Sequence, residues 1–335
     1  MVNAFDWIER ELKPSTCTSE EFIYDDMDSQ SGRSLPIIYQ PFDAARKSHW
    51  QDRGSLFDYL FSTQGEGKRL LDFGPGDGWP SLIVAPFVKE VVGVEGSHRR
   101  VRVCAENAAR LRILNARFIY VPPGAKLPFE DNAFDGVMAA SSVEQSPDPK
   151  ATLQELFRVL RPGGCLRVYY ESLHAYRDGR EHDIWLWPID DKTCRLILFD
   201  RYIDQERVRQ YGITLAMSRE EVRNSLAGEG RPLSFDLVTI TALEKLHYAI
   251  VDARLCITTH PSGRTLVSWL NEIGFQHVLP SHSGARFAGQ LFERIPQSRR
   301  PGDLEAVDAL LRPVVEIAVQ MAAPIDMDPM ITAIK

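Results

Sequence analysis

Cysteine is scarce in this sequence, and long apolar runs are absent. The five cysteines, Cys17, Cys104, Cys165, Cys194 and Cys256, are odd in number, widely spaced and free of any CxxC pair. This pattern argues against a disulfide framework and against a structural zinc site. No run of about 18 apolar residues occurs, so no membrane span is expected. The opening MVNAFDWIER has no apolar signal segment. These absences predict a cytoplasmic protein with reduced thiols.

Positive charge is not in excess either. The formal net charge is −7, and phosphate binding needs a basic face, so nucleic acid is not expected as a main partner. The most basic stretch runs from His98 to Arg102. Apolar residues at helical spacing through Val101, Cys104 and Ala108 predict a helix that turns these arginines toward solvent. The acidic balance favours a small molecule over nucleic acid as partner.

From residue 68 to residue 171 the sequence alternates between strand and helix patterns. Runs rich in apolar residues predict strands at 70–73, 91–95, 117–121, 134–139 and 165–170. Pro80 suits the first position of one intervening helix, and Asp148 with Pro149 is a typical start for another. Strands separated by helices predict an α/β fold with a parallel sheet covered on both faces.

The stretch LLDFGPGDGW (70–79) places three glycines directly after a predicted strand. A glycine-rich turn from strand to helix lets the backbone approach a ligand closely. Glu95 stands 21 residues after Gly74, at the end of the next strand, where a carboxylate can accept hydrogen bonds from ribose hydroxyls. Dinucleotide sites and S-adenosylmethionine sites share this arrangement. The dinucleotide pattern GxGxxG would need glycine at position 79, which is Trp79.

Four segments carry a family resemblance, in order along the chain. They are LLDFGPGDG (70–78), VVGVEGS (91–97), GAKLPFEDNAFDGVMAASSVEQSPDP (124–149) and LQELFRVLRPGG (153–164). Together they resemble the class I S-adenosylmethionine-dependent methyltransferases, in particular the small-molecule subfamily that includes ubiquinone/menaquinone methyltransferases. The resemblance implies a Rossmann-like three-layer αβα sandwich with a mostly parallel seven-stranded sheet. It also implies S-adenosyl-L-methionine as cofactor and methyl transfer to an O, N or C atom of a small molecule.

The same resemblance assigns cofactor contacts to matching residues. The glycines would lie against the methionine part of the cofactor, Asp72 would fix its ammonium group, and Glu95 would hold the ribose. Gly124 and Ala125 would lie beside adenine, with a backbone N–H available to a ring nitrogen, and Ser141 would lie under the sulfonium. The expected contacts are Asp72, Phe73, Gly74, Gly76, Gly78, Glu95, Gly124, Ala125 and Ser141.

Two positions depart from the family pattern. Gly124 stands where an acidic residue is frequent, and Gln145 follows Glu144 where a histidine is frequent. These departures concern adenine recognition and the substrate side of the site. They leave open a regulatory module that binds S-adenosylmethionine without catalysis. An NAD-dependent oxidoreductase is a third hypothesis, against which Trp79 and the segment RVLRPGG count.

Catalysis of methyl transfer rests largely on alignment and exclusion of water. A general base is needed when the acceptor is a hydroxyl or a protonated amine. Candidates by position are Glu144 after the fourth strand, and Tyr170, Glu171 and His174 after the fifth. Glu144 could equally be a solvated helix-start residue, and the position of the other three favours exposed loop residues over a catalytic role. No metal-ligand motif is present, so no metal is expected.

Domain boundaries follow from where the strand–helix alternation breaks. The core is predicted over 66–171, and residues 263–299 complete its sheet. Residues 1–65, together with an inserted α+β region over 172–262, are predicted to form a substrate cover, which could also dock a peptide acceptor. Within these parts the patterns predict a helix from about 241 to 256, a helix capped by Ser262, and a closing strand over 287–295.

The residues from 300 to 335 are predicted to form one amphipathic helix followed by an extended end. This tail could pack on its own domain or on a second copy of the chain in a homodimer, and the sequence leaves both open.

Overall fold

The computed structural model describes residues 3–19, 21–22, 41–169, 180–202, 205–325 and 330–335. Two compact units share the chain: unit 1 comprises 1–33 and 176–260, and unit 2 comprises 34–175 and 261–335. No helix in the described ranges is long and apolar enough to cross a membrane. The same ranges bring together no group of three or more His, Cys, Asp or Glu side chains that could hold a metal ion.

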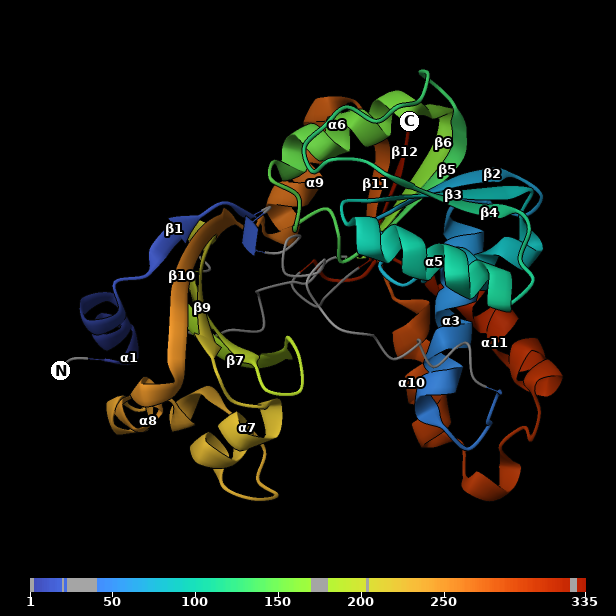
Figure 1. Ribbon diagram of the computed structural model, residues 1–335. Helices are drawn as coiled ribbons and strands as arrows, with labels where there is room; N and C mark the ends of the chain where they lie inside the picture. Colours follow the sequence, from blue (N-terminus) through green and yellow to red (C-terminus); the bar gives the residue numbers. More distant parts are fainter. Residues whose placement is uncertain (1–2, 20, 23–40, 170–179, 203–204, 326–329) are drawn as a thin grey trace. The chain divides into compact units, whose positions relative to one another are not determined.

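Unit 2 is built around a seven-stranded sheet in the order β11-β12-β6-β5-β2-β3-β4 (Figure 1). Its strands are β2 (Arg69–Phe73), β3 (Glu90–Glu95), β4 (Ala116–Tyr120), β5 (Phe134–Ala140), β6 (Leu160–Tyr169), β11 (Gln276–Ser281) and β12 (Met330–Ile334). Neighbours from β6 through β4 are parallel, whereas β12 is antiparallel to both β6 and β11. The predicted α/β fold with a mostly parallel, seven-stranded sheet is confirmed.

Helices cover both faces of this sheet (Figure 1). One face carries α6 (Pro149–Val159) and α9 (Gly263–Ile273), and the other carries α3 (Lys47–Ser62), α4 (Ser81–Val84), α5 (His98–Arg110), α10 (Gly284–Arg294) and α11 (Leu304–Ala318). Asp148 and Ser262 cap α6 and α9 as predicted, since their side chains accept hydrogen bonds from Ala151 N and Thr265 N. The two faces bury separate apolar clusters on the strands, which is the three-layer arrangement expected from the sequence.

Two predictions for the C-terminal part of unit 2 are wrong. Residues 287–295 belong largely to helix α10, because Ala288, Leu291, Phe292 and Ile295 recur at helical spacing and pack on the α3 side of the sheet. Residues 263–299 also do not complete the sheet, because the extended end of the chain adds a strand to it. This end supplies β12, which lies between β6 and β11. Helix α11 packs within its own unit, in the same apolar cluster as α3.

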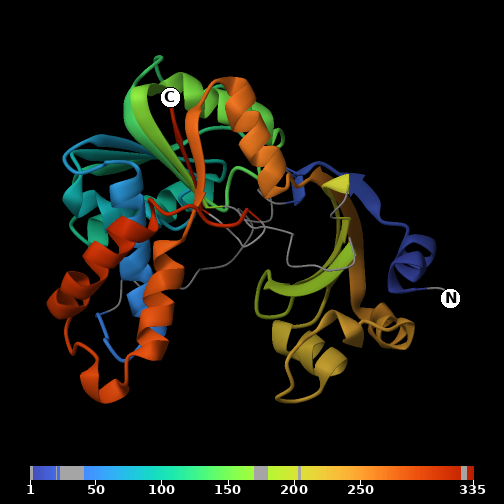
Figure 2. The same ribbon diagram turned by 180° about the vertical axis from the view of Figure 1, so that it is seen from behind.

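Unit 1 contains a five-stranded sheet in the order β1-β10-β9-β8-β7 (Figures 1 and 2). Its strands are β1 (Ser15–Cys17), β7 (Arg180–Pro188), β8 (Cys194–Tyr202), β9 (Arg207–Leu215) and β10 (Ile250–Thr259). The short helix α1 (Ala4–Trp7), α7 (Arg219–Ala227) and α8 (Ile240–Leu246) share one apolar cluster with β8 and β9. The structure thus divides the predicted N-terminal segment 1–65: residues up to 33 join unit 1, and α3 joins unit 2.

The predicted helix from 241 to 256 is also wrong over its second half. Helix α8 ends at Leu246, a single 3-10 turn follows over His247–Ala249, and β10 begins at Ile250. From Asp252 onward, β10 pairs with β9 in antiparallel register, with Cys256 opposite Gln210. Hydrogen bonding to a strand distant in sequence therefore overrides the local helical spacing.

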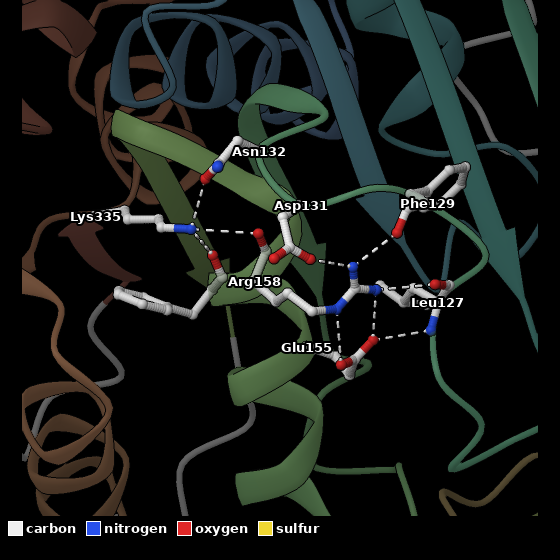
Figure 3. Close-up of polar contacts among 8 residues, drawn as sticks. Leu127, Phe129, Asp131, Asn132, Glu155, Arg158 and Lys335 are labelled. Atoms are coloured by element: carbon white, nitrogen blue, oxygen red, sulfur yellow. Dashed lines mark hydrogen bonds and ion pairs between the residues drawn. The ribbon is translucent and has the colours of Figure 1, made fainter.

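The two C-terminal family segments, 124–149 and 153–164, are joined by Arg158 of α6 (Figure 3). Its guanidinium donates to the carbonyl oxygens of Leu127 (2.9 Å) and Phe129 (2.7 Å), and pairs with Asp131 (2.9 Å) and Glu155 (2.8 Å). Glu155 in turn accepts a hydrogen bond from Leu127 N (3.0 Å). These contacts hold the loop between β4 and β5 against α6. They give a structural reason for the first arginine in RVLRPGG, which is Arg158.

Candidate cofactor site

The glycine-rich turn lies between β2 and α4, at the carboxyl end of the parallel strands. Gly74 and Gly76 have φ of +73° and +59°, which favour glycine. A Cβ at Gly74 would lie only 2.5 Å from the Cβ of Ser142, after β5, whereas a Cβ at Gly76 would meet no atom within 4 Å. Gly74 is therefore required for close packing of the turn, and the backbone at Gly76 faces open space.

Asp72 is fully buried at the end of β2. One carboxylate oxygen, Oδ2, accepts hydrogen bonds from Ser81 N (3.0 Å) and Ser81 Oγ (2.6 Å) at the start of α4. The other oxygen, Oδ1, is buried and has no hydrogen-bond partner. The pKa of Asp72 is raised to about 7, mainly by burial and also by the nearby charge of Glu95, while the hydrogen bonds from Ser81 oppose the shift. The residue therefore offers one acceptor oxygen to a donor that the protein itself does not supply.

Glu95 ends β3, and its carboxylate binds the turn from the other side. Oε2 accepts a hydrogen bond from Gly76 N (3.0 Å), and Oε1 accepts from Gly96 N (2.8 Å) and Ser97 N (3.3 Å). Burial raises the pKa of Glu95 to about 7, although these backbone hydrogen bonds oppose the shift. The structure therefore brings the predicted Asp72, Gly76 and Glu95 into one cluster.

Helix α5 supports the glycine turn from behind. Arg100 forms an ion pair with Asp77, Asn107 Nδ2 donates to Asp77 O (2.8 Å), and Cys104 Sγ lies 3.2 Å from Gly76 O. The prediction that the arginines of this helix all face solvent is wrong for Arg100, which is 4% exposed. Its buried partner Asp77 belongs to the turn, so helical spacing within α5 could not indicate the pairing.

The loops after β4 and β5 contain the remaining predicted cofactor contacts. Ser141 has φ of +49°, and its N–H donates to Tyr169 O (2.8 Å). Ser142 Oγ donates to the carbonyl oxygen of Phe73 (2.5 Å), which ties this loop to the glycine turn. Ala125 N donates to Pro122 O (3.0 Å) within its own turn, so this N–H is not simply available to an adenine nitrogen.

Of the predicted catalytic candidates, Glu144 lies in the described part of the chain. It is 8% exposed, so it is not a solvated helix-start residue. Tyr170, Glu171 and His174 lie outside the described residues. A general-base role for any of the four stays a prediction.

A pocket of about 380 Å³ opens within unit 2, between α3 and α10. Its lining residues come from these helices, from the residue after the glycine turn, from the carboxyl end of β6 and from the start of β12. They include Ser55, Tyr59, Trp79, Tyr169, Arg286 and Met330. The size is in the range of small-molecule sites.

The sequence of this chain matches those of known methyltransferases. The methyltransferase-domain family matches residues 71–168. An uncharacterized methyltransferase of Bacillus subtilis, YcgJ, is 31% identical over 208 residues, which cover 51% of this chain and 82% of YcgJ. The chain belongs to the S-adenosylmethionine-dependent methyltransferases. Its cofactor is S-adenosyl-L-methionine.

Two sterol methyltransferases match this methyltransferase over a shorter region. Sterol 24-C-methyltransferase erg6 of Schizosaccharomyces pombe is 35% identical over 105 residues, or 31% of this chain and 28% of the relative. Sterol 4-C-methyltransferase strm-1 of Caenorhabditis elegans is 31% identical over 119 residues, or 35% of this chain and 36% of the relative. The chain thus spans only about a third of the length of these curated relatives.

The site of this methyltransferase fits its cofactor on three observations. The unpartnered Oδ1 of Asp72 suits an ammonium group, the backbone at Gly76 is open to a ligand, and the Glu95 carboxylate lies beside that opening. Sequence reasoning did not single out Ser81, Ser142, Arg100 or Asn107, which hold these groups in place. Each of them acts through a partner from another element, so no local pattern marked them.

Proposed function

We propose that this chain is an enzyme that transfers the methyl group of S-adenosyl-L-methionine to an O, N or C atom of a small molecule. The observation that carries the proposal is the cluster of Asp72, the glycine turn and Glu95, in a chain of the methyltransferase family. The sterol methyltransferases among its relatives act on carbon by their names, so carbon acceptors belong in any substrate panel.

The residues of the cluster have distinct expected roles. Asp72 Oδ1 accepts a hydrogen bond from the cofactor's ammonium group, and Glu95 accepts from its ribose hydroxyls. Gly74, Gly76 and Gly78 keep the backbone close to the methionine part, while the adenine lies beside Gly124 and Ala125. Phe73 and Ser141 complete the expected contacts. When bound, the cofactor supplies an electrophilic methyl group, and the chain's task is to align the acceptor and exclude water.

The other predictions from the sequence stand as proposals of the same kind. They are the ubiquinone/menaquinone-like subfamily, a substrate cover formed by residues 1–65 and 172–262, a cytoplasmic location and a homodimer. A non-catalytic module that binds the cofactor is the main alternative, and Gly124 and Gln145 are its support. Turnover of S-adenosylmethionine with a panel of acceptors separates that module from an enzyme.

Titration calorimetry with S-adenosylmethionine, S-adenosylhomocysteine and NAD tests the proposal first. We expect both S-adenosyl ligands to bind and NAD not to bind. Glu95→Gln should lower the affinity for both S-adenosyl ligands by about 10- to 100-fold, because hydrogen bonds from the ribose to a charged acceptor are lost. Glu90→Gln is the matched control, since Glu90 is at the other end of β3, paired with Arg69 and Arg117. Preference for NAD would contradict the proposal.

The affinity for S-adenosylmethionine should rise with pH from 5.5 to 7. Asp72 and Glu95 both have a pKa raised to about 7 by burial, so each is largely protonated at pH 5.5 in the free protein. The cofactor's ammonium and ribose hydroxyls bind the ionised carboxylates, so binding releases protons in this range. Asp72→Asn should reduce the slope of log affinity against pH. A flat profile in the wild type would argue against both roles.

The stability of the free protein should change in the opposite direction. In the folded protein the pKa of Asp72 and of Glu95 is about 7. In the unfolded chain both carboxyl groups have their ordinary, lower pKa values. Between about pH 4 and pH 7 the folded state therefore binds more protons, and these two groups lower the free energy of unfolding as the pH rises. Thermal unfolding with and without cofactor distinguishes this trend from the binding trend.

A further inference from the structure

The pocket between α3 and α10 contains two buried hydrogen-bond donors that lack partners. They are the hydroxyl of Tyr59, on α3, and the indole Nε1 of Trp79, directly after the glycine turn. Tyr59 is only 1% exposed, and the two rings meet edge to face with centroids 6.0 Å apart. A buried polar group without a partner costs about 1–3 kcal/mol, so two in contact indicate a ligand that accepts hydrogen bonds.

The hydroxyl of Tyr59 is suited to donate rather than to accept. Burial raises its pKa well above the ordinary value, and the negative charges of Asp58 and Asp72 act in the same direction. Asp58 is itself occupied, because its carboxylate pairs with the buried Arg167. The hydroxyl therefore remains protonated at any physiological pH.

The glycine turn also carries an unpartnered acceptor. Asp72 and Trp79 are at the two ends of the glycine turn, and the charge of Asp72 acts on the Tyr59 hydroxyl. Since Oδ1 of Asp72 also lacks a partner, the turn carries one unpartnered buried acceptor in addition to the donor of Trp79. The α-carbon of an amino acid carries the complementary pair, an ammonium group and a carboxylate.

We propose that Tyr59 and Trp79 bind the carboxylate of the cofactor's methionine part, opposite the ammonium site at Asp72. The inference rests on the proposed function and extends the site from the glycine turn to α3. It gives a role to the aromatic residue after the third glycine, because the indole N–H of Trp79 adds a side-chain donor beside the turn. The part of the pocket that α10 lines is not used by this carboxylate.

The test compares S-adenosylmethionine with its decarboxylated form, which keeps the amine and the sulfonium and lacks the carboxylate. Calorimetry is done on the full chain. Tyr59→Phe and Trp79→Phe should each lower the affinity for S-adenosylmethionine by about tenfold, which corresponds to the loss of one hydrogen bond to a charged group. Both variants should bind the decarboxylated ligand as the wild type does. Tyr59→Phe removes a hydroxyl without a partner, so folding is preserved.

Two comparisons make the result specific. Tyr248→Phe, at an 81% exposed position of unit 1, is the matched control and should change neither affinity. Asp72→Asn should lower the affinity for both ligands, because both carry the amine. Equal loss for the two ligands in Tyr59→Phe and Trp79→Phe, or no loss, overturns the carboxylate role while leaving the proposed function intact. Failure of the wild-type chain to bind either ligand overturns the proposed function as well.

Discussion

Replacing Arg167 by methionine is expected to lower the free energy of unfolding of unit 2 by about 3–5 kcal/mol. The side chain is fully buried in β6 and forms a bidentate pair with Asp58 of α3, at 2.8 and 3.0 Å. It also donates to Ser281 Oγ (2.6 Å), Thr332 Oγ1 (2.8 Å) and His282 O (3.1 Å). Methionine would leave the Asp58 carboxylate buried without its countercharge.

Denaturant unfolding followed by circular dichroism measures this loss. The double variant Asp58→Asn/Arg167→Met should recover part of it, because removal of both charges leaves no buried charge uncompensated. Lys150→Met is the control: its ion pair with Glu272 is exposed, and we expect no measurable change in the midpoint. A small effect in Arg167→Met would mean that Asp58 is neutralised or rehydrated when its partner is lost.

Gly74→Ala is expected to weaken binding of S-adenosylmethionine by about 100-fold or more. A left-handed φ costs a non-glycine residue roughly 1–2 kcal/mol, and the added Cβ would lie 2.5 Å from Ser142 Cβ. Neither atom is at the end of a flexible side chain, so the turn or the loop after β5 must move. Both carry expected cofactor contacts, and the displacement therefore acts directly on the site.

Calorimetry on Gly74→Ala and on Gly67→Ala separates the two causes. Gly67 also has a positive φ, +68°, but a Cβ there would meet nothing within 4 Å. This control should lose stability and keep its affinity. Adding Ser142→Gly to Gly74→Ala should restore part of the binding by making room. Equal affinities for Gly74→Ala and the wild type would show that the turn adapts freely.

The sequence was most informative where the structure is locally determined. The apolar runs of β2, β3 and β5 predicted buried parallel strands, and Asp148 and Ser262 predicted helix starts. Helix α10 was missed although its apolar residues recur at helical spacing. Gly289 disfavours a helix by propensity, yet a Cβ there would lie 3.1 Å from Gln51 Nε2 and Lys47 Cε on α3. Glycine at position 289 allows α10 and α3 to approach each other closely, and no local sequence pattern reveals this requirement.

The cofactor site divides in the same way. Asp72, Gly76 and Glu95 could be predicted, because their spacing along strand, turn and strand is short and regular. The groups that hold them could not. Arg100 was assigned to solvent because the apolar residues of its helix recur at helical spacing on another face, and the buried Asp77 that pairs with it lies on the turn. The unpartnered donors of Tyr59 and Trp79 became visible only from the contacts around them.

The place of β12 in the sheet has a consequence for the order in which the chain folds during synthesis. All strands of unit 1 have been made by residue 259, so that unit can form early. In unit 2 the other six strands are complete by residue 281, yet β6 and β11 lack the strand between them until residues 330–334 emerge. Until then two strands keep unpaired edges, the kind of surface that recruits other chains. Between these two points we therefore expect the nascent methyltransferase to expose strand edges that the finished sheet covers.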